Sequence, residues 1–256
     1  MKPILFTIGP FNVFAFGFFL ALSFLFSTYI IWKYGKDELS EDLFLDGFLY
    51  TAVGMLFSAR AVYIATHFNQ FGTNILKYLV MREYPGLSLF GGLAGGVLVL
   101  WFFLRRRKVS FLHITDIFAL AFTFSLAFAK LGEFLGGAGF GVKTTLPWGV
   151  RIIGLPGKYH PVELYEMLSF LGIFIFLSFV YRKIRKDKSK EGFTSLLFLL
   201  FLSLETLFFE LFKEKSLFWS SLSFKQIFTL PVIFAVLTIL LLQIKKRGKE
   251  GKPVKK

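Results

Sequence analysis

The sequence predicts an all-α, polytopic membrane protein with about seven transmembrane helices. Hydrophobic residues make up 55% of the 256 positions, and the mean hydropathy is +0.64. The apolar residues gather in long runs, and runs near or above about 18 residues are typical of membrane spans. A soluble domain of this length buries a core without such runs.

Seven apolar segments follow one another along the chain, and each is long enough, with some tilt, to cross a hydrocarbon core of about 30 Å. They cover residues 11–32, 44–66, 88–104, 111–129, 161–181, 193–212 and 226–244. The first is predicted to be a retained span, because Lys2 is a poor signal-peptide n-region and no small-residue cleavage site follows. Residues 67–86 are expected to form a short amphipathic helix at the interface. The whole chain, 1–256, is interpreted as one domain.

The cations indicate an orientation. With seven spans, the first, third and fifth connections and the tail share one side, and they hold 19 of the 30 Lys and Arg residues. The positive-inside rule then predicts an outer N-terminus and a cytoplasmic C-terminus. The basic tail, about 245–256, is expected to be solvated or to face anionic lipid. This arrangement accounts for most of the net charge of +14 without a nucleic-acid partner.

One stretch, Lys130–Glu166, is too polar for lipid and too rich in glycine for one regular helix. The same topology puts it on the outer side. Its first glycines are expected to permit positive φ and to expose N–H groups that can cradle phosphate, although such loops often only turn the chain. These glycines are Gly136, Gly137, Gly139 and Gly141. Arg151 and Lys158 add positive charge, so the stretch is a candidate anion site.

The end of this stretch, His160-Pro-Val-Glu-Leu-Tyr-Glu166, opens the fifth span. Pro161 suits the first turn of a helix. His160, Glu163 and Glu166 are three residues apart, so one helical face is expected to carry them. A lone histidine is more often structural than catalytic, but a histidine with two acids at the mouth of a membrane cavity favours a functional role. Because no second cluster of ligands is evident, no metal site is predicted.

Other polar residues lie inside predicted spans, where ionisable groups are functional candidates. Arg60 is expected either to bind a phosphate or carboxylate or to snorkel to the interface. Glu205 and Glu210 lie in the sixth span, and an ion pair of Glu210 with Lys213 is the structural alternative for that acid. The glycines from Gly91 to Gly96 predict close helix packing, the alternative being a backbone surface for a lipid headgroup.

These motifs, in this order, resemble those of the prolipoprotein diacylglyceryl transferase family over nearly the whole chain. Residues 130–141, KLGEFLGGAGFG, are similar to a signature that begins Arg-x-Gly-Asn-Phe. Residues 146–150, LPWGV, follow at the expected place. Residues 160–166, HPVELYE, resemble the motif His-Pro-x-Gln-Leu-Tyr-Glu. SAR at 58–60, GGLAGG at 91–96 and SFKQIFTLP at 223–231 also match.

The resemblance implies an enzyme of the bacterial inner membrane that takes part in lipoprotein biosynthesis. It moves a diacylglyceryl group from phosphatidylglycerol to the lipobox cysteine of a prolipoprotein and releases glycerol phosphate, without a metal or organic cofactor. Its partners are the anionic lipid and the membrane-tethered precursor. The expected catalytic residues are His160, Lys130, Glu133 and Glu210. The expected substrate-binding residues are Arg60, Gly137, Gly141, Arg151, Tyr165 and Glu166.

Six positions that are regarded as important for transfer in the family are substituted in this sequence. The signature arginine is Lys130, its asparagine is Glu133, and its acid falls at Ala138. Three further positions are substituted: Phe16, Phe90 and Thr206 stand in place of a tyrosine, a histidine and an arginine. Two alternatives therefore remain beside the transferase, namely a family member that binds lipid or lipoprotein without transfer, and a lipid transporter.

Overall fold

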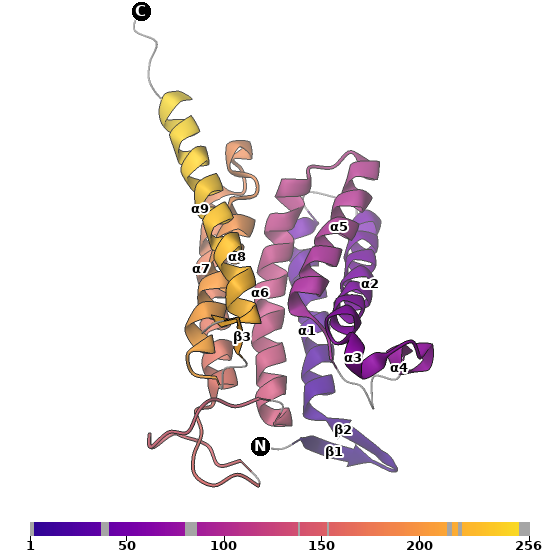
Figure 1. The fold of residues 1–256 in the computed structure, drawn as a ribbon. Helices are drawn as coiled ribbons and strands as arrows, with labels where there is room; N and C mark the ends of the chain where they lie inside the picture. The colour runs from indigo at the N-terminus through magenta and orange to yellow at the C-terminus, as the bar shows by residue number, and fades with distance from the viewer. Residues whose placement is uncertain are drawn as a thin grey trace, which may run out of the picture. The chain divides into compact units, whose positions relative to one another are not determined.

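The computed structural model describes residues 3–36, 41–79, 86–137, 139–152, 154–213, 217–219 and 222–250. The chain divides into two compact units, and each is described by itself. One unit contains residues 1–30 and 115–256, and the other contains residues 31–114. Figure 1 labels the elements in chain order. The prediction of a single domain stays a prediction.

Six helices are long and apolar enough to cross a membrane, among the residues that the structure describes. Five are the elements α1 (Ala15–Gly35), α2 (Glu41–Thr66), α5 (Leu89–Arg107), α6 (Phe111–Gly136) and α7 (Val162–Ile184). The sixth is α8 (Phe193–Glu210), together with the short 3-10 turn η1 (Lys188–Lys190). The predicted seventh span falls on α9 (Phe224–Glu250), whose apolar part, Thr229–Gln243, is shorter. The all-α, multi-span fold class is confirmed.

The N-terminus differs from the prediction of a span that starts at residue 11. Strands β1 (Ile4–Ile8) and β2 (Phe11–Phe14) pair antiparallel, and α1 begins only at Ala15. The physical reason is the Gly9-Pro10 turn, in which Gly9 has φ +57°. A Gly-Pro pair favours a reversal of the chain, and the β-branched and aromatic residues on either side suit strands.

In the larger unit, the N-terminal part of α1 packs against α6 through small polar side chains. Ser23 Oγ donates to the carbonyl oxygen of Ser125 at 3.1 Å, and Ser27 Oγ donates to that of Ala121 at 3.3 Å. Hydroxyls of this kind hydrogen-bond between helices where water is scarce. Near the end of α6, a Cβ on Gly132 would lie only 2.9 Å from Phe19 Cβ, so the glycine lets the helices approach closely.

The same unit ties α6 to the start of α8 with a buried carboxylate. Asp116, which is 3% exposed, accepts the N–H groups of Gly192 at 2.9 Å and Ser195 at 2.7 Å. It also accepts the Ser195 hydroxyl at 2.7 Å. A carboxylate at a helix N-terminus satisfies unpaired N–H groups and complements the helix dipole. Helix α8 in turn packs against α7 and α9, and α9 also contacts the short strands β3 (Leu217–Trp219) and β4 (Leu222–Ser223).

In the smaller unit, α2 and α5 form a close pair, as the glycines of the third span predict. Ser88 caps α5 by accepting the N–H of Gly91. A Cβ on Gly91 would lie 2.5 Å from Val62 Cβ, and one on Gly54 would lie 2.5 Å from Val99 Cγ2. Glycine is therefore required on both helices for this approach.

Arg60 of α2 is buried and donates hydrogen bonds to the backbone of the segment between α2 and α5. Its Nε donates to the carbonyl oxygen of Tyr78 at 3.1 Å, and its Nη1 donates to that of Gly86 at 3.1 Å. Its guanidinium also lies 5.1 Å from the centre of the Phe71 ring. The single interfacial helix predicted for residues 67–86 is instead two short helices, α3 (Phe68–Phe71) and α4 (Ile75–Leu79). Gly72, at φ +58°, separates them, and residues 80–85 lie outside the described ranges.

Candidate functional site

The candidate site begins on the last turns of α6. The helix runs to Gly136, seven residues beyond the predicted end of the span at 129. The predicted end of this span was therefore wrong, and Lys130 and Glu133 lie on the helix. Their i,i+3 spacing on a helix brings the two side chains together, and Lys130 Nζ donates to Glu133 Oε2 at 2.7 Å.

A charged cluster forms where α6, the first turns of α7 and the end of α8 come together. We define it as Lys130, Glu133, Glu163, Glu166, Glu205 and Lys213. Lys130 Nζ also lies 3.0 Å from Glu166 Oε2, and Lys213 Nζ donates to Glu166 Oε1. Glu166 is only 6% exposed, and it thus bridges two ammonium groups from different parts of the chain. Such a buried carboxylate is stable only when it is paired in this way.

Glu163 lies one helical turn before Glu166 and is 3% exposed. Its Oε1 is 4.0 Å from Lys213 Nζ. Its Oε2 has no hydrogen-bond donor among the described residues. A Cβ on Gly139 would lie 2.3 Å from Oε1, so the carboxylate rests against the bare backbone of the glycine-rich loop.

Glu205 adds a further buried acid from α8. It is 7% exposed and lies within electrostatic reach of Glu166, Lys130 and Lys213. Its Oε1 has no hydrogen-bond partner in the described part of the chain. The cluster therefore contains four carboxyl groups and two ammonium groups, and it offers both positive charge for an anion and carboxylate oxygens for a proton.

The glycine-rich loop between α6 and α7 packs closely beside this cluster. Gly137 ends α6 with φ +71°, as expected for a left-handed helix cap. Gly136, Gly139 and Gly141 do not adopt positive φ, although glycine permits it. Gly141 is glycine for lack of space, since a Cβ there would lie 2.5 Å from the carbonyl oxygen of Phe212. Ala138 lies outside the described residues.

His160 lies at the end of this loop, not on α7, because Pro161 is the N-cap and the helix begins at Val162. The prediction of one helical face for His160, Glu163 and Glu166 therefore holds only for the two acids. The imidazole ring is 5.5 Å from the Phe212 ring and 6.2 Å from the Tyr165 ring, measured between centres. Its Nδ1 is buried without a hydrogen-bond partner among the described residues.

The other predicted site residues lie in different surroundings. Tyr165 accepts a hydrogen bond from Trp148 Nε1 at 2.8 Å, which ties α7 to the loop. Arg151 is exposed on the loop, and Glu210 is 7% exposed at the end of α8. Arg60 belongs to the other unit, where it binds backbone carbonyl groups.

Three of the substituted family positions lie on helices. Phe16 of α1 contacts the end of α6, Phe90 lies on α5, and Thr206 Oγ1 donates to the carbonyl oxygen of Leu202.

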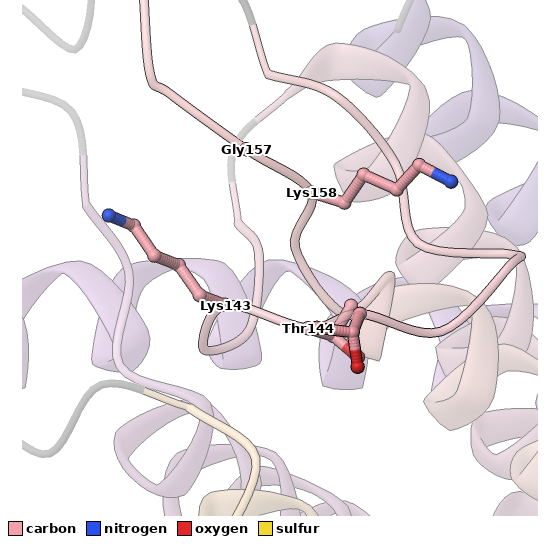
Figure 2. A pocket seen from close by; sticks show the side chains of 5 residues that line it. Lys143, Thr144, Gly157 and Lys158 are labelled. Atoms are coloured by element: carbon pink, nitrogen blue, oxygen red, sulfur yellow. The ribbon is translucent and has the colours of Figure 1, made fainter.

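The loop also forms an open pocket of about 450 Å³, lined by Lys143, Thr144, Thr145, Gly157 and Lys158. Figure 2 shows the side chains of Lys143 and Lys158 extending away from each other. Lys158 Nζ donates to the carbonyl oxygen of Pro147 at 3.3 Å. The two ammonium groups do not converge on one anion, so the charged cluster is the stronger candidate site. In the described ranges, no group of three or more His, Cys, Asp or Glu residues is placed to hold a metal ion.

Sequence reasoning missed the role of Lys213, which it paired with Glu210 on the same helix. In the structure, Lys213 follows α8 and its ammonium binds Glu166, 47 residues earlier in the chain. Glu163 and Glu205 were noted as acids but not selected. The signal for Glu163 was its i,i+3 spacing from Glu166, whereas nothing local predicts the approach of Lys213.

Comparisons with known proteins agree with this architecture. The family model described as prolipoprotein diacylglyceryl transferase matches residues 3–242. A phosphatidylglycerol–prolipoprotein diacylglyceryl transferase of Finegoldia magna is 27% identical over 236 residues, which cover 92% of this chain and 93% of the relative. The protein of the same name from Clostridioides difficile is 28% identical and covers 90% of each chain. The family model spans α6, α7, α8 and Lys213, which carry the whole charged cluster, and the two relatives match this chain over nearly the full length of each protein. The chain therefore belongs to the prolipoprotein diacylglyceryl transferase family.

Proposed function

We propose that this chain transfers a diacylglyceryl group from phosphatidylglycerol to the lipobox cysteine thiol of a prolipoprotein, in the bacterial inner membrane. Membership of the family supports the reaction, and the names of the relatives supply both substrates. The observation that carries the proposal is the pair of ammonium groups, Lys130 and Lys213, held together by Glu166 within a largely apolar helical scaffold. This arrangement suits the negatively charged headgroup of a lipid that enters the site from the membrane.

The reaction is an alkyl transfer to sulfur. The cysteine thiolate attacks the glyceryl carbon that bears the phosphate, and the C–O bond breaks so that glycerol phosphate leaves. Thiolate, and not thiol, is the nucleophile, so a base must be near. The leaving phosphate needs preorganised positive charge, which acts most strongly where water is excluded. We assign the phosphate to Lys130, supported by Lys213 and by N–H groups near Gly137 and Gly141.

The remaining predicted residues take supporting roles in this proposal. His160 and Glu210 are candidate proton-transfer groups at the outer end of the helices, and Glu133 holds the Lys130 ammonium in place. Tyr165 and Glu166 orient the start of α7 against the loop and the lysines. Arg151, exposed on the loop, is a candidate contact for the lipid headgroup, and Arg60 stays a predicted binding residue of the other unit. An ammonium is a point charge, so Lys130 lacks the bidentate grip of the family's arginine.

The proposal is tested with purified protein, phosphatidylglycerol vesicles and a synthetic lipobox peptide, and the thioether product is detected by mass. The wild-type chain is expected to form the product. Lys130→Met, which keeps the unbranched shape but removes the charge, is expected to lose about 100-fold or more of the rate, as for other preorganised charge-stabilising groups. Lys130→Arg is expected to remain active.

The matched control is Lys188→Met in the exposed connection before α8, which should leave the rate unchanged. All variants are compared by thermal unfolding in detergent, because Lys130→Met leaves Glu133 and Glu166 with one cation fewer. If the wild-type chain forms no product where an active relative does, the transferase proposal is overturned in favour of a family member that binds without transfer.

A further inference from the structure

Glu163 differs from the other acids of the charged cluster in how its two oxygens are neutralised. Glu166 Oε2 also makes no hydrogen bond in the described part of the chain, but each Glu166 oxygen has an ammonium group within 3.0 Å, and Glu133 is hydrogen-bonded to Lys130. Glu163 has one oxygen toward Lys213 and the other, Oε2, without a donor in the described part of the chain. It is therefore a buried carboxylate with a cation on one side and an unused acceptor on the other.

An unused acceptor at this depth is costly. A buried polar atom without a hydrogen-bond partner has lost its contacts with water and gained none in return, and this penalty is larger when the group is charged. Such atoms are rare in folded proteins, and they occur where a ligand supplies the missing partner. A thiol S–H is a donor of the right kind, so an acceptor cysteine would satisfy Glu163 Oε2.

Glu205 also has a carboxyl oxygen without a partner, but its surroundings differ. Among the described residues no ammonium lies within ion-pair distance of Glu205, whereas Lys213 Nζ lies 4.0 Å from Glu163. Glu163 also lies in the first turn of α7, where the helix dipole favours a carboxylate, whereas Glu205 lies within α8. Of the two acids, Glu163 is the one held ready as a base.

The glycine-rich loop packs against the other oxygen of this carboxylate, Oε1. Gly139 places bare backbone against Glu163, and any side chain at that position would collide with Oε1. The loop thus leaves the carboxyl group in place and adds no side chain over it.

We propose that Glu163 is the catalytic base of this chain, with Lys213 as its positioning residue; the proposal rests on the transferase function above. Glu163 takes the proton from the cysteine S–H, and the sulfur forms a C–S bond with the glyceryl carbon. The C–O bond to phosphate breaks with its electron pair on the oxygen. Glu163 then returns the proton to the glycerol phosphate, so no further reactant is needed.

The first test is Glu163→Gln, which keeps the shape and removes the base. Turnover with the cysteine peptide is expected to fall by about 100-fold or more, as is usual for general base catalysis. Glu191→Gln, the same change in the connection before α8, is the matched control and should keep full turnover. Equal turnover of Glu163→Gln and wild type overturns the assignment.

A second substrate separates a chemical role from a structural one. A peptide with selenocysteine in place of cysteine carries a more acidic selenol that is ionised at neutral pH, so it needs no base. If Glu163 is the base, Glu163→Gln turns over the selenol peptide at a rate near that of wild type. If the loss is equally large with both peptides, Glu163 has a structural role and the proposal is overturned. Wild type that is inactive on both peptides contradicts the transferase function instead.

Discussion

At the scale of single residues, this chain differs from the family signature in which charged side chains form the site. The family's signature arginine is a lysine here, and its asparagine is Glu133, which is hydrogen-bonded to that lysine. An acid is missing at position 138, and one is gained at Glu163 where the similar motif has glutamine. Lys130 and Glu133 are three residues apart on α6, so local spacing pairs these two substituted residues. No local spacing connects Lys213 with Glu166, whose pairing follows from the folded structure.

Gly141 shows how closely the loop is packed. A Cβ there would lie 2.5 Å from both the Phe212 carbonyl oxygen and Val162 Cγ2, and 2.8 Å from His160 Cβ. We expect Gly141→Ala to destabilise the protein by about 1–3 kcal/mol, which is usual for overpacking, and to lower transfer by displacing His160. Thermal unfolding in detergent and the peptide assay measure the two effects.

The control for Gly141→Ala is Gly172→Ala in α7, where a Cβ has nothing within 4 Å. Alanine is the better helix former by about 0.5–1 kcal/mol, so this variant should be slightly more stable than wild type. If Gly141→Ala unfolds at the same temperature as Gly172→Ala, the close contact described for the loop is wrong.

At the scale of elements, the apolar runs predicted the helices well because hydrophobic length is a local property. Their ends were harder to place. The first span was predicted to begin at residue 11, but residues 11–14 pair with β1, and the Gly9-Pro10 turn was the signal available for that hairpin. Helix α6 continues through Lys130 and Glu133 because the two side chains pair with each other and Lys130 also pairs with Glu166 of α7. Glu166 is distant in sequence, so composition alone ended the predicted span too early.

The Asp116 contact is a prediction at the same scale. Asp116 accepts two N–H groups and one hydroxyl at the start of α8. We expect Asp116→Ala to destabilise the protein by about 1–3 kcal/mol, because buried N–H groups lose their acceptor. Ser195→Ala removes only the hydroxyl bond and should cost about 1 kcal/mol. Thermal unfolding of both variants in detergent checks the order, and a larger loss for Ser195→Ala would contradict this account of the cap.

At the scale of the whole molecule, the distribution of cations predicts an orientation that can be measured directly. The sequence contains no cysteine, so single cysteines can be introduced without removing native ones. Leu155 is 40% exposed on the glycine-rich loop, and Ser189 is exposed in η1 between α7 and α8. The positive-inside rule assigns the lysine-rich connection at Ser189 to the cytoplasm and the loop at Leu155 to the outer side.

In whole cells whose outer barrier is opened, a membrane-impermeant maleimide should therefore label Leu155→Cys. It should label Ser189→Cys only after the inner membrane is also made permeable. Labelling after denaturation controls for expression and thiol reactivity, and each variant must keep transfer activity. The arrangement matters for the reaction, because the charged cluster adjoins the loop that carries Leu155 and the membrane-tethered precursor is expected on the outer side. Labelling of Ser189→Cys before permeabilisation, with Leu155→Cys protected, would reverse the orientation and remove the proposed site from the side that its acceptor reaches.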